Sequence, residues 1–212
     1  MKTLSVTDCI SFGWRTFKAR PWFFIGVSLI VVAISFVSGL LQGFAASALG
    51  KTPGGIVSFL ISLLADNLIA IGILSIYLKA HDAVMSAEFK DFMRFKLYWV
   101  FLAASILVSF LTIVGLVLLI IPGIIVMTML CFTATLIVDR NLGPIEAIKE
   151  SARLTKGNRW KIFLLLIVVV LLNIVGAIAL IVGVLIAMPI SMLALVHAYR
   201  TLSTPEAPVL VA

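Results

Sequence analysis

The sequence predicts an all-α, polytopic integral membrane protein with six transmembrane helices arranged as three hairpins. Hydrophobic residues make up 63% of the 212 residues and charged residues only 12%, whereas soluble domains carry about 25% charged residues. The apolar runs are continuous and lack period-2 alternation, so helices are expected to satisfy their backbone polar groups inside a bilayer. Each pair of apolar runs follows a basic amphipathic stretch and a tryptophan. These tryptophans are Trp22, Trp99 and Trp160.

The first repeat-like unit is predicted over residues 1–80. Its first element, residues 1–21, is expected to be an interfacial helix on the cytoplasmic surface, ended by a proline. Residues of helical spacing form its apolar face: Val6, Ile10, Trp14 and Phe17. Transmembrane helices are predicted at 22–49 and 56–78, with a turn at 50–55 between them. The first run has 28 residues, whereas the apolar region of a signal peptide has about 7–15, so we expect it to be retained.

The second unit is predicted over residues 81–138. A second amphipathic helix is expected within the polar stretch 79–96. Its apolar face would consist of Met85, Phe89, Phe92 and Met93. Apolar runs at 97–121 and 122–138 predict the next two transmembrane helices. Only Pro122-Gly123 marks the turn, because no charged residue separates these runs.

The third unit is predicted over residues 139–203, which completes a single membrane domain spanning 1–203. Its amphipathic helix is expected to begin at Pro144, since proline suits a first helical position. The last two apolar runs, 160–185 and 189–202, predict the fifth and sixth transmembrane helices. A flexible tail is expected at 204–212. Internal duplication would explain the three units, although any three membrane hairpins can look alike.

The basic residues predict the orientation of the chain. Fifteen of the 16 Lys and Arg residues lie in residues 1–21, 79–96 and 139–161 or at Arg200, and only Lys51 lies on the other side. Positively charged loops stay in the cytoplasm. We therefore expect a multi-pass protein of the cell (inner) membrane with both termini and all three amphipathic helices in the cytoplasm.

Three polar residues are predicted inside the bilayer: Asp66 and Asn67 in the second apolar run and Asn173 in the fifth. Asp66 and Asn173 each lie about 20 Å from the cytoplasmic boundary, at 1.5 Å per helical residue. A contact between them is our hypothesis. It could belong to a proton- or ion-linked path, or it could be an interhelical hydrogen bond worth ~0.6–2 kcal/mol.

The third amphipathic segment is the candidate cytoplasmic face. Its charged residues are spaced for i,i+3 and i,i+4 pairing. The candidate residues of this face are Asp139, Glu146, Lys149, Glu150, Arg153, Lys156 and Arg200. They could form a docking face or a lipid-headgroup site, or they could be a solvated helix surface with internal charge pairs. Asp139 is expected to cap this segment or to meet Arg140 or Arg200.

A spaced set of residues in the second half of the chain resembles a known bacterial and archaeal membrane family. The set is Pro122-Gly123-Ile124, Val138-Asp139, Gly143, Glu146-Ala147-Ile148, Ser151, Leu154, Gly157 and Trp160, followed by Gly183, Pro189, Ala198-Tyr199-Arg200 and Leu202, with Ser11, Trp14 and Phe17 near the start. The family is the membrane domain attached to glycerophosphodiester phosphodiesterases, with its free-standing relatives of unknown function. The resemblance implies six membrane helices. It does not imply phosphodiesterase activity, since no segment of this sequence could supply that domain.

Sequence motifs for catalysis are absent: there is no nucleotide-binding loop, GxSxG or HExxH. His81 and His197 have no neighbouring cysteine or acidic cluster in the sequence, so no metal site, cofactor or nucleic-acid partner is expected. The first hypothesis is a non-enzymatic protein that interacts with anionic lipid or a partner at its cytoplasmic face, possible partners including a second copy of the chain. The alternative is a small-solute or ion- or proton-linked transporter or channel that uses Asp66 and Asn173. A membrane enzyme ranks last.

Overall fold

The computed structural model describes residues 4–89 and 97–203. Within these ranges the chain folds into α-helices and one short 3-10 helix, without strands. Six of the helical spans are long enough and apolar enough to cross a membrane. The predicted fold class, an all-α multi-pass membrane protein, is confirmed. The predicted tail at 204–212 lies outside the described residues.

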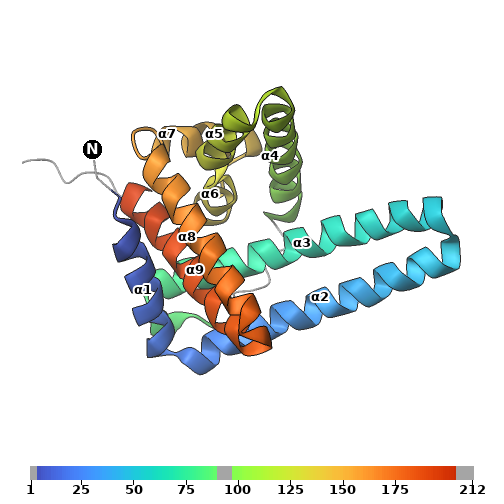
Figure 1. Cartoon of the computed structure of the whole chain (residues 1–212), viewed down its shortest axis with the longest axis horizontal. Helices are drawn as coiled ribbons and strands as arrows, with labels where there is room; N and C mark the ends of the chain where they lie inside the picture. Colours follow the sequence, from blue (N-terminus) through green and yellow to red (C-terminus); the bar gives the residue numbers. More distant parts are fainter. Residues whose placement is uncertain (1–3, 90–96, 204–212) are drawn as a thin grey trace, which may run out of the picture.

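Helix α1 (Val6–Ala19) begins where the Ser5 hydroxyl accepts a hydrogen bond from the Asp8 backbone N–H at 3.3 Å. Its buried side consists of Cys9, Gly13, Thr16 and Phe17. This side packs along α9 (Figure 1), where a Cβ on Gly13 would lie 2.6 Å from the Ile190 carbonyl oxygen. Of the predicted apolar face, Phe17 is buried in this contact, whereas Trp14 is exposed. Small residues instead allow the close approach of α1 to α9, and the membrane contact of the apolar face stays a prediction.

Helices α2 (Pro21–Leu49) and α3 (Lys51–Asp82) form a long antiparallel pair whose far half extends away from the other helices (Figure 1). Pro21 begins α2 instead of merely ending α1, because its missing N–H costs nothing at a first helical position. The turn is a single residue, Gly50, with φ of 79°, and not the predicted segment 50–55. The following residues join the first turns of α3, where Gly54 packs directly against the α2 backbone.

The connection after α3 contains a 3-10 helix, Val84–Ser86. Arg20 anchors this connection, since its guanidinium donates to the carbonyl oxygens of Val84 at 2.9 Å and Ala87 at 3.2 Å. The second amphipathic helix was expected within 79–96. In the structure α3 continues to Asp82, and residues 83–89 contain no α-helix. Residues 90–96 lie outside the described residues, so the prediction stays untested there.

The fourth span is broken. Helix α4 (Tyr98–Leu118) turns at Leu119 into α5 (Ile120–Leu130), and a separate α6 (Thr133–Arg140) follows. A single helix over 122–138 had been predicted. Ser151 stabilises the break from outside, because its hydroxyl donates to the Met129 carbonyl oxygen at 2.7 Å and accepts from the Phe132 N–H at 3.3 Å. The hydroxyl thus replaces backbone partners that the helix gives up at this point.

Ser151 belongs to α7 (Pro144–Leu154), the third predicted amphipathic segment, and it is fully buried. The prediction that Pro144 begins this helix is confirmed. Ala147 and Ser151 face the bundle, whereas Lys149 and Arg153 are exposed. The helix therefore packs through small side chains against the preceding elements.

Helices α8 (Arg159–Ile178) and α9 (Leu180–Ser203) turn at Ala179. The sequence had placed this turn between Gly183 and Pro189. Pro189 instead lies inside α9, where a proline leaves the carbonyl four residues earlier without its helical N–H partner. That carbonyl belongs to Leu185, and the Ser28 hydroxyl of α2 donates to it at 3.4 Å. A tertiary contact thus compensates for a residue that would otherwise favour a break.

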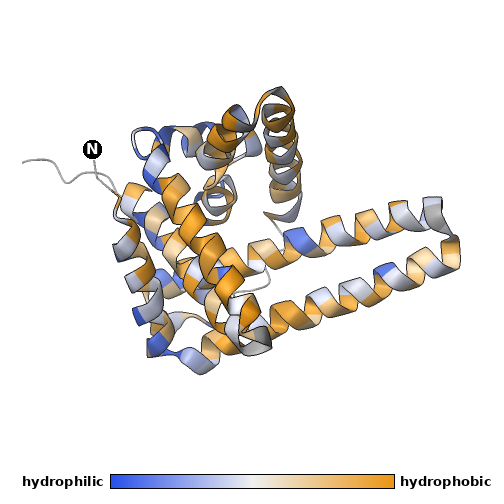
Figure 2. Cartoon of the chain, viewed as in Figure 1, coloured by the Kyte–Doolittle hydropathy of each residue, from blue (hydrophilic) through white to orange (hydrophobic). Residues whose placement is uncertain are grey.

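Trp22, Trp99 and Trp160 are each the second residue of a spanning helix, α2, α4 and α8 respectively. Their exposed fractions are 84%, 74% and 69%. Exposed tryptophans at helix starts are typical of a membrane–water boundary. Figure 2 shows mostly hydrophobic spanning helices, with hydrophilic residues gathered around α1 and α7.

The packed core lies at the end of the molecule where α1, α6 and α9 meet the last turns of α3. Phe24 stacks on Tyr77 with ring centroids 5.7 Å apart, and both side chains are fully buried. Phe132 lies against Tyr199 in the same core. This core holds three helix ends in place, and the candidate site is built on them.

Candidate functional site

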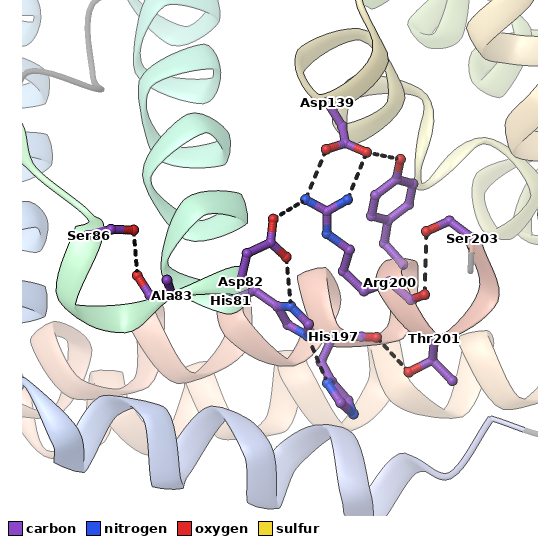
Figure 3. Close-up of polar contacts among 10 residues, drawn as sticks. His81, Asp82, Ala83, Ser86, Asp139, His197, Arg200, Thr201 and Ser203 are labelled. Atoms are coloured by element: carbon purple, nitrogen blue, oxygen red, sulfur yellow. Dashed lines mark hydrogen bonds and ion pairs between the residues drawn. The ribbon is translucent and has the colours of Figure 1, made fainter. Parts of the chain in front are cut away.

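The C-terminal ends of α3, α6 and α9 meet at a group of polar side chains that we call the helix-end cluster: Asp82, Asp139, Tyr199 and Arg200. Arg200 lies between the two carboxylates (Figure 3): its Nη2 is 2.6 Å from Asp82 and 3.0 Å from Asp139, and its Nη1 donates to Asp139 at 3.1 Å. The Tyr199 hydroxyl donates to Asp139 at 2.6 Å. The expected contact between Asp139 and Arg200 is therefore present.

The positions of these residues at helix ends explain why the two carboxylates require a nearby positive charge. Helix C-termini carry a partial negative charge, which disfavours a carboxylate and favours a cation. Asp82 ends α3 and Asp139 is the last but one residue of α6, so both carboxylates sit at unfavourable ends. Arg200, in the last turn of α9, places its positive charge beside both carboxylates. The cluster thereby joins three helices from three parts of the chain.

A histidine pair extends the cluster toward α1. His81 contacts Asp82 at 3.3 Å, and its Nε2 lies 3.0 Å from Nδ1 of His197. Phe12 of α1 stacks on the His197 ring, with centroids 4.2 Å apart. The sequence placed both histidines near helix ends but did not predict their contact. Among the residues that the structure describes, no group of three or more His, Cys, Asp or Glu side chains could hold a metal ion.

The exposed side of α7 presents the second part of the candidate site. Glu150 accepts two hydrogen bonds from Arg153, each 2.7 Å long, and lies 3.3 Å from Arg140. The hydrogen bonds from Arg153 hold the pKa of the Glu150 carboxyl below its ordinary value. Glu146 folds back to accept from the Gly143 N–H at 3.3 Å, which caps the helix. Both acidic residues thus have structural roles.

Three basic residues remain on the outer surface here, and we call them the basic face: Lys149, Arg153 and Lys156. Trp160 lies four residues after Lys156, at the start of α8, and is 69% exposed. Cationic groups beside an exposed indole are a combination that suits the headgroup region of a membrane.

The intramembrane polar residues do not meet as predicted. Asn173 lies five residues before the end of α8, and its amide donates to the Ser191 hydroxyl of α9 at 2.8 Å. Asn67 accepts from the Ser105 hydroxyl of α4 at 2.7 Å. The hypothesis of an Asp66–Asn173 contact is therefore wrong, because each asparagine joins its own helix to a neighbour. Asp66 lies at the middle of the 32-residue α3 and lines a cavity.

Sequence reasoning missed two contributors. Asp82 and His81 end α3, and His197 lies in the C-terminal part of α9. The basic residues gather on the same predicted side of the membrane, and that shared side was the available signal. The role of Ser151 gave no such signal, because the broken span that it stabilises was not predicted.

No curated protein and no solved structure matches this chain. One family model matches residues 29–212, which include every spanning helix from α3 onward and most of α2. Its description states no activity, and the resemblance to the phosphodiesterase-linked membrane domains stays a prediction. The chain belongs to the family described as Domain of unknown function (DUF7847).

Proposed function

We propose that this protein is a non-enzymatic component of the cell (inner) membrane, with both termini in the cytoplasm, and that its basic face binds anionic lipid. The observation that carries the proposal is the projection of Lys149, Arg153 and Lys156 from α7 and the turn after it, away from the packed side of the helix. The exposed Trp160 beside them supplies an anchor at the same boundary. The absence of catalytic motifs in the sequence supports the non-enzymatic part.

The three charges of the basic face differ in how far a neighbouring carboxylate compensates them. Arg153 is held by Glu150 through two hydrogen bonds, so its charge is partly compensated. Lys149 and Lys156 are exposed and carry most of the expected attraction. A lysine near an anionic membrane surface contributes about 1 kcal/mol at physiological ionic strength. The two together would favour an anionic lipid over a zwitterionic one by about tenfold or more.

Other occupants of the same face are a membrane partner or a second copy of this chain. The alternative of an ion- or proton-linked transporter has weaker support, because Asn173 is engaged with Ser191 and the cavity at Asp66 is mainly apolar. A transport path would need further polar groups at that depth. The lipid proposal uses groups that are already exposed.

The test uses protein reconstituted in phosphatidylcholine bilayers that contain trace spin-labelled lipid. Electron paramagnetic resonance reports the fraction of label immobilised by the protein, for phosphatidylglycerol and for phosphatidylcholine labels separately. We expect the phosphatidylglycerol label to be preferred, the preference to fall as salt is raised, and the double variant Lys149→Gln/Lys156→Gln to lose most of it.

Lys51→Gln is the matched control, since it removes a positive charge from the opposite end of the long helical pair. This variant should keep the preference of the wild type. An unchanged preference in the double variant would refute lipid binding by the basic face. Loss of preference in both variants alike would point to the net charge of the protein instead.

A further inference from the structure

We propose that an open cavity between the spanning helices of this protein binds a hydrophobic organic cation, with its cationic group at the Asp66 carboxylate and its apolar part among the helices. The described lining includes no residue of α7, so this inference goes beyond the lipid binding proposed for the basic face. It rests on a cavity of about 360 Å³ at Asp66. That volume falls within the range of about 300–1,000 Å³ that small-molecule pockets occupy.

The cavity is formed where five helices converge. Ile69, Ala70 and Ile73 line it from the same helix as Asp66, and Met192 lines it from α9. The remaining wall comes from α2, from α8, and from the break between α5 and α6. Irregular backbone at membrane depth occurs where it is buried in protein or lines a cavity. The break thus adjoins a space that a ligand could fill.

Among the residues that the structure describes, Asp66 is the only charged one that lines this cavity. Its side chain is exposed, and none of the described residues forms a hydrogen bond or an ion pair with it. A charged carboxylate at membrane depth is energetically costly. A bound cation would remove much of that cost, and so the carboxylate favours a positively charged occupant.

The other lining residues favour an organic cation over an inorganic one. Besides Asp66, the described lining offers side-chain oxygen atoms only from Ser35 and Thr135, whereas inorganic cations such as Ca²⁺ take about six to eight oxygen ligands. An organic cation needs a single counter-charge and apolar contacts for its body. The lining matches this second pattern, because polar groups in ligand pockets are few and serve to orient the ligand.

A second cavity of about 260 Å³ lies next to the first. The two cavities share Cys131, Ala134 and Leu166 as lining residues, and the second extends toward α4, where Phe101 and Val108 line it. A ligand with its head at Asp66 could therefore pass an alkyl chain beside Ala134 into the second cavity. The geometry points to a single-chain amphiphile with a quaternary ammonium or protonated amine.

The experiment measures binding of decyltrimethylammonium to the full chain in phosphatidylcholine nanodiscs, by equilibrium dialysis against empty nanodiscs. Decanesulfonate, with an alkyl chain of equal length and the opposite charge, is the matched probe. We expect saturable binding of the cation and, in the Lys149→Gln/Lys156→Gln background that weakens anion binding at the basic face, markedly weaker binding of the anion. Asp66→Asn should weaken cation binding about tenfold or more, because it removes the negative charge that faces the quaternary ammonium in a site of low dielectric.

Two further variants locate the site. Ala134→Phe should weaken binding by placing a ring at a residue that lines both cavities, and Asp66→Glu should retain binding. Asp8→Asn removes an exposed carboxylate from α1, far along the chain from the cavity lining, and should bind like the wild type. Circular dichroism and gel filtration establish that each variant is folded.

Equal affinity for the cationic and anionic probes in the Lys149→Gln/Lys156→Gln background would overturn the proposal, and this comparison holds even if Asp66→Asn fails to fold. Unchanged cation affinity in a folded Asp66→Asn variant would overturn it as well. Neither outcome depends on anion binding by the basic face, so both are distinct from a failure of the lipid proposal.

Discussion

Replacing Asp139 by asparagine tests whether the helix-end cluster holds the bundle together. The carboxylate accepts hydrogen bonds from Tyr199 at 2.6 Å and from Arg200 at 3.1 Å, and a second Arg200 contact measures 3.0 Å. Asparagine preserves the size of the side chain and one acceptor oxygen. It removes the negative charge, and its NH₂ group cannot accept from the guanidinium.

The magnitude follows from the burial of the pair. Removing one partner of a fully buried ion pair costs ~3–5 kcal/mol, and a hydrogen bond to a charged group contributes ~1.5–3 kcal/mol. The Asp139 side chain is 15% exposed and that of Arg200 is 25% exposed, so water compensates part of the loss. We expect Asp139→Asn to lower the free energy of unfolding by about 2 kcal/mol.

Asp82→Asn is the matched control on the same arginine. The Asp82–Arg200 distance is the shorter one, at 2.6 Å, but the Asp82 side chain is 55% exposed. Exposed ion pairs contribute about 0–1 kcal/mol. The order of the two effects should therefore follow burial and not distance, with Asp139→Asn clearly the more destabilising.

The assay is equilibrium unfolding in mixed micelles with an increasing mole fraction of dodecyl sulfate, followed by far-ultraviolet circular dichroism and checked by refolding. Tyr199→Phe and the double variant with Asp139→Asn complete a cycle, for which we expect a coupling energy of about 1 kcal/mol. Equal destabilisation by Asp139→Asn and Asp82→Asn would refute the reasoning, as would a loss below about 0.5 kcal/mol for Asp139→Asn.

Three further predictions use the same unfolding assay. Ser151→Ala should lower the free energy of unfolding by ~1–3 kcal/mol, because a buried backbone N–H at the break loses its acceptor. Gly183→Ala should destabilise the α8–α9 pair, since its Cβ would clash with backbone, whereas Gly39→Ala meets nothing within 4 Å and should not destabilise. The pKa of Glu150 is lowered chiefly by hydrogen bonds from Arg153, so its contribution is present above the ordinary pKa of 4.5 and lost as pH falls through the lowered value. Glu150→Gln should therefore be less stable than the wild type at neutral pH, with a difference that shrinks under acidic conditions.

The sequence predicted the start of the first helix of each pair well, but it predicted the turn and the start of the second helix poorly. Charge and tryptophan mark the starts, and Trp22, Trp99 and Trp160 all prove to be the second residue of a helix. The turn between α8 and α9 lies within a continuous apolar run, so no composition change marks it. Pro189 was the misleading signal, because a hydroxyl on α2, from Ser28, satisfies the carbonyl that the proline frees. Local sequence cannot show a contact made across 157 residues.

Counting residues along a helix gives depth but not direction, and this explains the error at Asp66. Successive residues of an α-helix point about 100° apart, since a turn takes 3.6 residues. Asn67 therefore faces α4 and accepts from Ser105, while Asp66 faces the cavity. Asn173 could lie at the same depth as Asp66 and still be directed toward Ser191 on α9. The two asparagines hold neighbouring helices together at membrane depth, and this arrangement leaves the carboxylate of Asp66 facing a space large enough for a ligand.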